Sequence, residues 1–137
     1  MRFTRVCAAL TALGIFWAVP TSSHHNFSVA FDVERPVSVE GVVTGVKWEN
    51  PHTWIYVEVK RDDEQLEEWQ FESQPPNPLR RKGVTPRILK PGVTVTLKGY
   101  GTYDRSRTIA AANIIVFTSG EAFSIGSGRQ PPLTDDQ

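Results

Sequence analysis

A chain of 137 residues has room for a single domain. Its 15 Lys and Arg residues balance its 15 Asp and Glu residues, and a neutral chain with mixed signs argues against electrostatic binding of nucleic acid. Because Cys7 is the one cysteine, the chain can form neither an internal disulfide nor a site of two or more thiolates.

The N-terminal segment is typical of a secretory signal peptide. Arg2 and Arg5 accompany an uncharged apolar run that ends near Pro20, and small residues follow it. The run is shorter than the roughly 20 residues that a helix needs to cross a bilayer. We expect cleavage after residues 1–23, leaving a periplasmic or secreted protein with no stable membrane anchor. The alternative is an uncleaved anchor.

The middle of the chain alternates with the two-residue period of β-strands. The pattern runs through residues 37–43 and 55–59, and WENPHTW lies between them. Asn-Pro favours a turn, so we predict a hairpin with a type I turn that begins at Asn50 and holds His52 at its third position. A third strand is predicted at residues 66–72.

Prolines interrupt the strand pattern after the third strand. Asn77 can cap a short helix that starts at Pro78, and Thr85-Pro86 repeats the signal for a second turn. Two more strands are predicted, one beginning in KPGVTVTLKGY and one at residues 108–117. Residues 118–137 are rich in Gly, Ser, Pro and acidic side chains, which predicts a flexible tail.

The order of these elements is three strands, a short helical connection and two strands. This is the order of the OB-fold, a five-stranded, partly open barrel. We therefore predict an all-β, OB-like barrel domain over residues 24–117, with an antiparallel β-sandwich as the alternative. Fold alone does not assign a function.

Patterns typical of catalysis are missing from the sequence. It has no glycine-rich loop followed by Lys-Ser or Lys-Thr for phosphates and no nucleophile elbow. The adjacent carboxylate pairs, such as Asp62-Asp63 and Glu67-Glu68, fall at predicted turns and strand ends, where solvation explains them. We predict no catalytic residue and lean against an enzyme.

Aromatic residues flank the predicted hairpin turn. Trp48 and Trp54 lie on opposite arms, and Tyr56 shares the parity of Trp54. Such pairs stabilise hairpins by packing, and OB-folds also use aromatic faces to stack ligands. The sequence thus offers Trp48, Asn50, Trp54 and Tyr56 as a ligand-binding set, with hairpin packing as the alternative.

The three histidines fall into two motifs, TSSHHNF and WENPHTW. Cleavage after residue 23 makes His24 the first residue, and its α-amine and ring nitrogen can then chelate one metal ion. His25 and His52 can add nitrogens, and an all-nitrogen set favours Cu(II), then Ni(II), with Zn(II) as a further candidate. Glu72 is a candidate oxygen ligand or acceptor for an imidazole N–H. The alternative is a polar N-terminus and an ordinary turn histidine.

The stretches HHNFSVAFD, PVSVEGVVTGVKWENPHTWIYVEVK, WQFES, NPLRRKGVT and LKPGVTVTLKGY resemble a family of bacterial exported domains of unknown function. Its members open on His-His-Ser-Phe and carry an Asn-Pro-His hairpin, and this chain departs from that pattern at Asn26. The resemblance implies export and a small β-barrel, but no established activity.

A second, local resemblance concerns the metal hypothesis. An N-terminal histidine joined by a distant one is similar to the copper-binding brace of lytic polysaccharide monooxygenases and of some periplasmic copper carriers. His24 and His52 alone would correspond, so the resemblance implies copper binding or transfer rather than oxygenation.

Three hypotheses follow from the sequence. The first is a periplasmic domain that binds Cu(II) or another divalent metal through its histidines. The second is a metal-free module for a small ligand, carbohydrate or protein, and the third is an accessory domain with an envelope protein partner.

Overall fold

Eight elements form the structure, a computed structural model that describes residues 27–128 and 130–133. In chain order they are α1 (Phe27–Ala30), β1 (Phe31–Lys47), β2 (Thr53–Lys60), β3 (Leu66–Ser73), α2 (Pro76–Arg81), β4 (Thr94–Thr102), β5 (Ile109–Phe117) and β6 (Ala122–Ser124).

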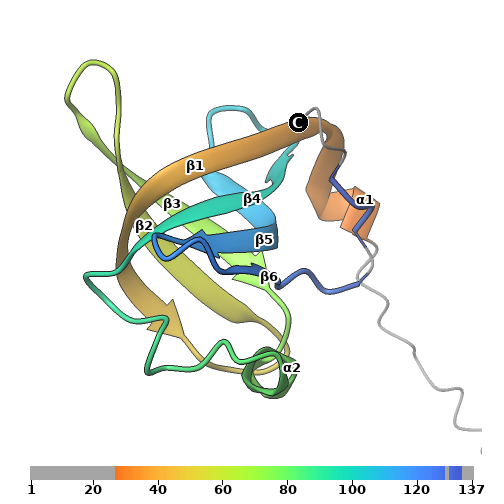
Figure 1. Cartoon of the computed structure of the whole chain (residues 1–137). Helices are drawn as coiled ribbons and strands as arrows, with labels where there is room; N and C mark the ends of the chain where they lie inside the picture. Colours follow the sequence, from red (N-terminus) through yellow and green to blue (C-terminus); the bar gives the residue numbers. More distant parts are fainter. Residues whose placement is uncertain (1–26, 129, 134–137) are drawn as a thin grey trace, which may run out of the picture.

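The strands pair with their neighbours in an order that closes into a ring (Figure 1). The antiparallel neighbours follow the order β3-β2-β1-β4-β5-β6, and a parallel pairing of β3 with β5 joins the two sides into a ring. That pairing aligns Gln70 with Ile109 and Glu72 with Ala111. The prediction of an all-β, OB-like domain with a short helical connection is confirmed, and β6 is an additional strand outside the five expected.

The long strand β1 belongs to both sides of the ring. Its first part pairs with β4 as far as Val42, and its last part pairs with β2 up to Lys47 opposite Trp54. A register shift between Val43 and Gly45 interrupts the second pairing, and such irregularities increase the bend of a strand. The predicted hairpin is confirmed, and its first strand is longer than the expected residues 37–43.

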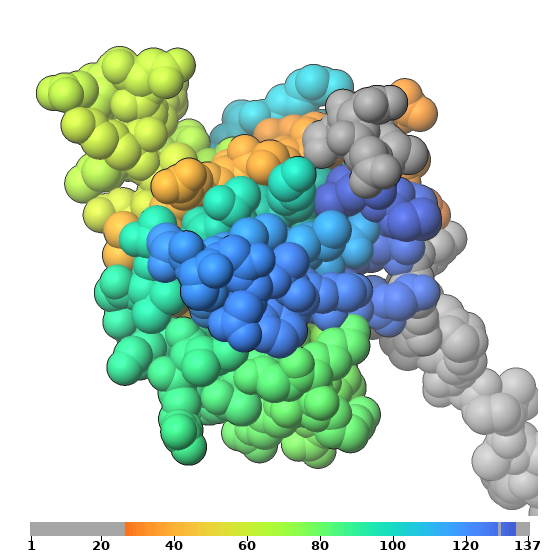
Figure 2. Space-filling view, viewed as in Figure 1, coloured from red at the N-terminus to blue at the C-terminus, as the bar shows by residue number. Residues whose placement is uncertain are grey.

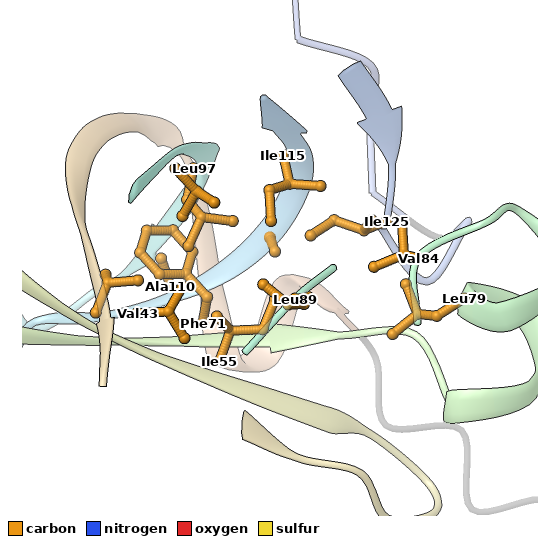
Figure 3. Packing of buried hydrophobic residues seen from close by; sticks show 13 residues of the cluster. Val43, Ile55, Phe71, Leu79, Val84, Leu89, Leu97, Ala110, Ile115 and Ile125 are labelled. Carbon is orange, nitrogen blue, oxygen red and sulfur yellow. The ribbon is translucent and has the colours of Figure 1, made fainter. Parts of the chain in front are cut away.

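The core fills the ring because alternate residues of each strand point inward. Phe71 and Ile55 are fully buried, and Figure 3 shows them facing side chains of the opposite strands. The buried cluster comprises Val43, Ile55, Val57, Phe71, Leu79, Val84, Leu89, Val95, Leu97, Ala110, Ala112, Ile115 and Ile125.

A second, smaller cluster lies on the outer side of the ring. Phe31, Tyr100 and Ala111 are buried there, and Phe27 packs against them. The ring of Phe27 stacks on Phe31 with centroids 5.4 Å apart and meets the edge of Tyr100 at 6.0 Å. This cluster, hereafter the Phe27 cluster, attaches the start of the described chain to β4 and β5.

The helical connection differs in detail from its prediction. The helix begins at Pro76, with Pro75 at the N-cap and no side-chain capping hydrogen bond, whereas we expected Asn77 to cap it. Proline needs no N–H partner in the first turn, so the proline pair itself can start the helix. The second predicted turn is present, because the N–H groups of Ile88 and Leu89 both donate to the carbonyl of Thr85.

The segment after β5 contradicts the expectation of a flexible tail from residue 118. β6 pairs with β5, and Ile125 is fully buried in the main core, beside Val84 and Leu79 in Figure 3. The carbonyl of Ile125 also accepts hydrogen bonds from the Ser73 hydroxyl and the Gln74 N–H. The burial of Ile125 and the two hydrogen bonds to its carbonyl outweigh the polar composition of the surrounding residues. The predicted signal peptide, residues 1–23, lies outside the described residues, as do residues 134–137 of the predicted tail.

The space-filling view shows how these parts meet (Figure 2). The β2–β3 hairpin tip stands out from the body, while the segment that contains β6 lies against α2 and the residues that follow it. None of the described helices is long and apolar enough to span a bilayer.

We expect Gly99→Ala to destabilise the fold by at least about 2 kcal/mol. A Cβ at residue 99 would overlap the carbonyl oxygen of Ala111, a backbone atom that cannot move without breaking the pairing of β4 with β5. Gly45→Ala is the matched control, because its Cβ would meet nothing closer than a Tyr56 ring carbon at 3.7 Å. Urea unfolding measures both, and equal midpoints would contradict the prediction.

Ile125→Ala tests whether the chain beyond β5 belongs to the domain. We expect it to lower the free energy of unfolding by about 2–5 kcal/mol, as for other large-to-small changes in a core. Leu66→Ala, at a side chain that is 62% exposed, should change it by less than about 0.5 kcal/mol. Thermal unfolding of the two variants compares them, and a flexible tail would make both effects small.

Candidate functional site

The structure brings two of the predicted metal-site residues together. His52 lies just before β2, Glu72 lies near the end of β3, and Nδ1 of His52 is 3.0 Å from Oε1 of Glu72. The register aligns Trp54 with Glu72. Because Ile55 and Phe71 point into the core, alternation places Trp54 and Glu72 on the outer face of the ring.

The edge of the His52 imidazole that carries Nδ1 is shielded from solvent. Nδ1 is buried and makes no well-aligned hydrogen bond among the described residues, so its contact with Glu72 is a close approach of two polar atoms at 3.0 Å. The side chain of His52 is nevertheless 29% exposed and that of Glu72 24%. The exposed surface of the imidazole therefore belongs to atoms other than Nδ1.

A row of aligned residues connects this pair with the Phe27 cluster. Glu72 is aligned with Ala111 across the parallel pairing, and Ala111 with Tyr100 across the next antiparallel one. Neighbouring strands lie about 4.8 Å apart, so two spacings separate Glu72 from Tyr100. Phe27, the first residue described, packs against Tyr100. The N-terminal end of the described chain thus lies on the same face as His52 and Glu72.

The remaining predicted metal ligands, His24 and His25, lie outside the described residues. Within residues 27–128 and 130–133, no group of three His, Cys, Asp or Glu side chains forms a metal site. Of the four predicted metal-site residues, the described chain contains His52 and Glu72.

The structure separates the predicted aromatic ligand set. Trp48 packs against the main core, which is the packing alternative. Trp54 and Tyr56 are half-buried and alternate with core residues, so they face outward beside Glu72 and Gln70. Asn50 is exposed, its peptide bond to Pro51 is cis, and residues 50–51 form a bend rather than the expected type I turn.

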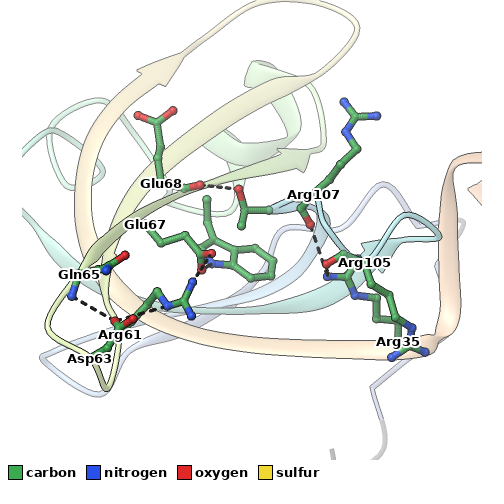
Figure 4. A network of polar contacts seen from close by, with 10 residues as sticks. Arg35, Arg61, Asp63, Gln65, Glu67, Glu68, Arg105 and Arg107 are labelled. Carbon is green, nitrogen blue, oxygen red and sulfur yellow. Dashed lines mark hydrogen bonds and ion pairs between the residues drawn. The ribbon is translucent and has the colours of Figure 1, made fainter.

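Figure 4 shows two further groups of polar contacts, which involve neither His52 nor Glu72. Arg35 donates hydrogen bonds to four backbone carbonyls at the end of β4 and in the loop that follows it, those of Thr102, Asp104, Arg105 and Arg107. In the second group the Trp69 indole N–H donates to Glu67, and Arg61 lies 3.6 Å from the same carboxylate. Both groups of contacts stabilise the local conformation of the chain.

The pKa of Asp104 lies below its ordinary value. The side-chain hydroxyl and then the backbone N–H of Ser106 donate to its carboxylate and stabilise the charged form; desolvation opposes them, and Arg107 and Arg35 add smaller favourable contributions. Because this carboxyl belongs to an exposed turn, its pKa reflects local hydrogen bonding rather than acid–base chemistry.

Sequence reasoning missed a polar cavity between the end of β3, β5 and the segment after β6, lined in part by Gln74, Lys82 and Asn113. Its residues come from four separate stretches of the chain, and the last of them falls in the predicted flexible tail. No local pattern of residues could have indicated it.

Together these features define a small all-β, OB-like domain with a half-exposed histidine–glutamate pair on its outer face. The chain belongs to DUF6152, a family of unknown function, whose model matches residues 14–111. The match includes both histidine motifs. No curated protein and no solved structure matches the chain.

We expect Nδ1 to carry the proton of the neutral His52 ring, because the carboxylate of Glu72 favours an N–H beside it. Imidazole ¹⁵N chemical shifts distinguish the two tautomers. Glu72→Leu should shift the population toward the Nε2–H form, whereas Glu68→Leu, an exposed glutamate on the same strand and face, should not. An unchanged spectrum for Glu72→Leu would refute the assignment.

Proposed function

We propose that this chain is an exported domain that binds a divalent metal, Cu(II) foremost, through His24, His25 and His52. The observation that carries the proposal is the 3.0 Å approach of Glu72 to Nδ1 of a partly exposed His52. Metal-binding histidines commonly direct their second ring nitrogen at a carboxylate, which fixes the tautomer and raises the basicity of the first. Glu72 would serve His52 in this way and leave Nε2 for the metal.

The reach of the N-terminus supports the same proposal. Three residues of extended chain span about 10 Å, which is the distance from Phe27 back to His24. Phe27 is packed on Tyr100, and two strand spacings, about 10 Å, separate Tyr100 from Glu72. The two lengths are of the same order, which supports the proposal that the histidines before Phe27 reach the neighbourhood of Glu72 and His52.

The donor types favour copper over harder ions. Imidazole nitrogens and a free α-amine form an all-nitrogen set, which suits tetragonal Cu(II) and then Ni(II), and three imidazoles also suit Zn(II). Removal of residues 1–23 would create the α-amine at His24, so export and metal binding are linked in this proposal. Because His24 and His52 alone correspond to the copper brace of the monooxygenases, we assign metal binding or transfer rather than oxygenation.

A second candidate function rests on Trp54 and Tyr56. Both are half-buried on the outer face and aligned with the polar residues Glu72 and Gln70. Indole and phenol faces beside polar groups are a common surface for small ligands. This candidate predicts tryptophan fluorescence changes with sugars or peptides that persist in strong chelator.

The metal proposal is tested on protein exported by its native host. Its intact mass should correspond to a chain that begins at His24, and calorimetric titration should show one Cu(II) bound. We expect Glu72→Leu to weaken binding by about 10–100-fold, the usual effect of removing a carboxylate that orients a ligand. His52→Ala should weaken it at least as much.

Two controls separate a specific site from binding at the N-terminus alone. Glu68→Leu should leave the affinity unchanged, and protein that retains residues before His24 should bind more weakly because it lacks the α-amine there. Equal affinity of the wild type and His52→Ala would overturn the proposal, as would a mature chain that starts beyond His25.

A further inference from the structure

A cluster of cations lies on α2 and the chain that follows it. Its members are all exposed, and residues 73–103 contain no Asp or Glu. They are Arg80, Arg81, Lys82, Arg87 and Lys90. Lys82 donates to the carbonyl of Ser124, and no carboxylate of the described residues forms an ion pair with any of the five. The described part of the chain therefore leaves this charge without a counter-charge.

Buried neighbours direct these side chains outward. Leu79, Val84 and Leu89 are fully buried, and Figure 3 shows them at the core. The residues between them, 80–83 and 86–88, are exposed. In the space-filling view this part of the chain covers the end of the molecule away from the β2–β3 hairpin tip (Figure 2). The five cations thus gather at one end of the molecule, hereafter the basic end.

One apolar side chain accompanies the cations. Ile88 is 39% exposed, although it neighbours the buried Leu89. Cations around an exposed aliphatic side chain suit the surface of an anionic bilayer, because the charges attract the headgroups and the apolar group enters the interface. Nucleic acid is a poorer partner, since residues 76–92 hold no aromatic side chain on which bases could stack.

The opposite end of the molecule carries the opposite charge. Residues 58–68, at the tip of the β2–β3 hairpin, contain six Asp and Glu and two Lys and Arg residues, and the tip points away from α2 (Figure 1). An anionic surface repels this hairpin and attracts the basic end, so the charge distribution orients the molecule. A second copy of the chain is a poorer partner, because Lys60 and Arg61 already pair with hairpin carboxylates and a head-to-tail contact does not close.

We propose that the basic end docks the domain reversibly on an anionic lipid bilayer. The arginine and lysine side chains would contact lipid phosphates, Ile88 would enter the interface, and the hairpin would point away from the membrane. Each cation close to such a surface strengthens binding about fivefold. The basic end contains none of the residues assigned to the metal site, so the two proposals stand or fall separately.

Vesicle co-sedimentation of the full exported chain in excess chelator tests this docking. We expect binding to vesicles made of equal parts of phosphatidylglycerol and phosphatidylcholine, and none to phosphatidylcholine alone. The affinity should fall at least about tenfold when the salt concentration rises from about 0.05 M to about 0.5 M, because salt screens exposed charges. Glycerol phosphate at matched ionic strength should not displace the protein, since one free phosphate cannot replace a charged surface.

Two variants and a matched control locate the surface. Arg80→Gln combined with Arg87→Gln should weaken binding at least about tenfold. Ile88→Ser should weaken it at least about threefold without changing its salt dependence. The control is Arg105→Gln combined with Arg107→Gln, which removes two exposed charges from the β4–β5 loop at the far end from α2 (Figure 1) and should change the affinity less than twofold. Circular dichroism verifies that each variant is folded.

Five results would overturn the proposal. Four are equal binding to neutral vesicles, displacement by glycerol phosphate, tighter binding to duplex DNA than to vesicles of the same phosphate concentration, and an unchanged affinity in the Arg80 and Arg87 double variant. The fifth is salt-sensitive self-association without vesicle binding, which analytical ultracentrifugation would detect and which would identify a second copy as the partner. His52→Ala should bind vesicles like the wild type, whatever its effect on copper binding.

Discussion

The parallel pairing of β3 with β5 is the contact on which the rest of the structure depends. It joins strands that lie about 40 residues apart, Gln70–Glu72 with Ile109–Ala111, and it turns an open sheet into a ring around one core. The same pairing sets Glu72 two strands away from Tyr100. The histidine–glutamate pair and the Phe27 cluster therefore share one outer face because the ring is closed.

The ring can close because glycine residues let the backbones of neighbouring strands approach one another closely. Gly99 and Gly41 lie where a methyl group would collide with the carbonyl oxygens of neighbouring strands, and Gly45 adjoins the irregularity that bends β1. The ring is completed at its end by a segment rather than a strand, since Ile125 enters the core and its carbonyl binds the end of β3. The polar cavity is lined by residues next to that join, among them Gln74 and Gly126.

Short-range patterns predicted much of the fold. The hairpin around WENPHTW and the alternation of β2 and β3 involve neighbours along the chain, so a single sequence contains their signal. The pairing of His52 with Glu72 was proposed only as one option, because it depends on the register of two strands. Burial of Ile125 and formation of the polar cavity depend on contacts between distant segments, and the polar composition after residue 118 masked them. For Trp48 the sequence leaves a ligand face and hairpin packing as alternatives, because the pattern along one strand does not show which side of a bend faces the core.

The packing of Phe27 on Phe31 and Tyr100 acts as a tether at a fixed point of the surface. Ligands on a short tether reach a nearby site at a high effective concentration, in the millimolar range for a flexible linker. In the proposed metal site the histidines before Phe27 would gain this advantage without any contact of their own with the barrel. Metal affinity would then depend on an aromatic contact that never touches the ion. Insertions or deletions between Phe27 and the histidines would be tolerated as poorly as substitutions of the ligands themselves.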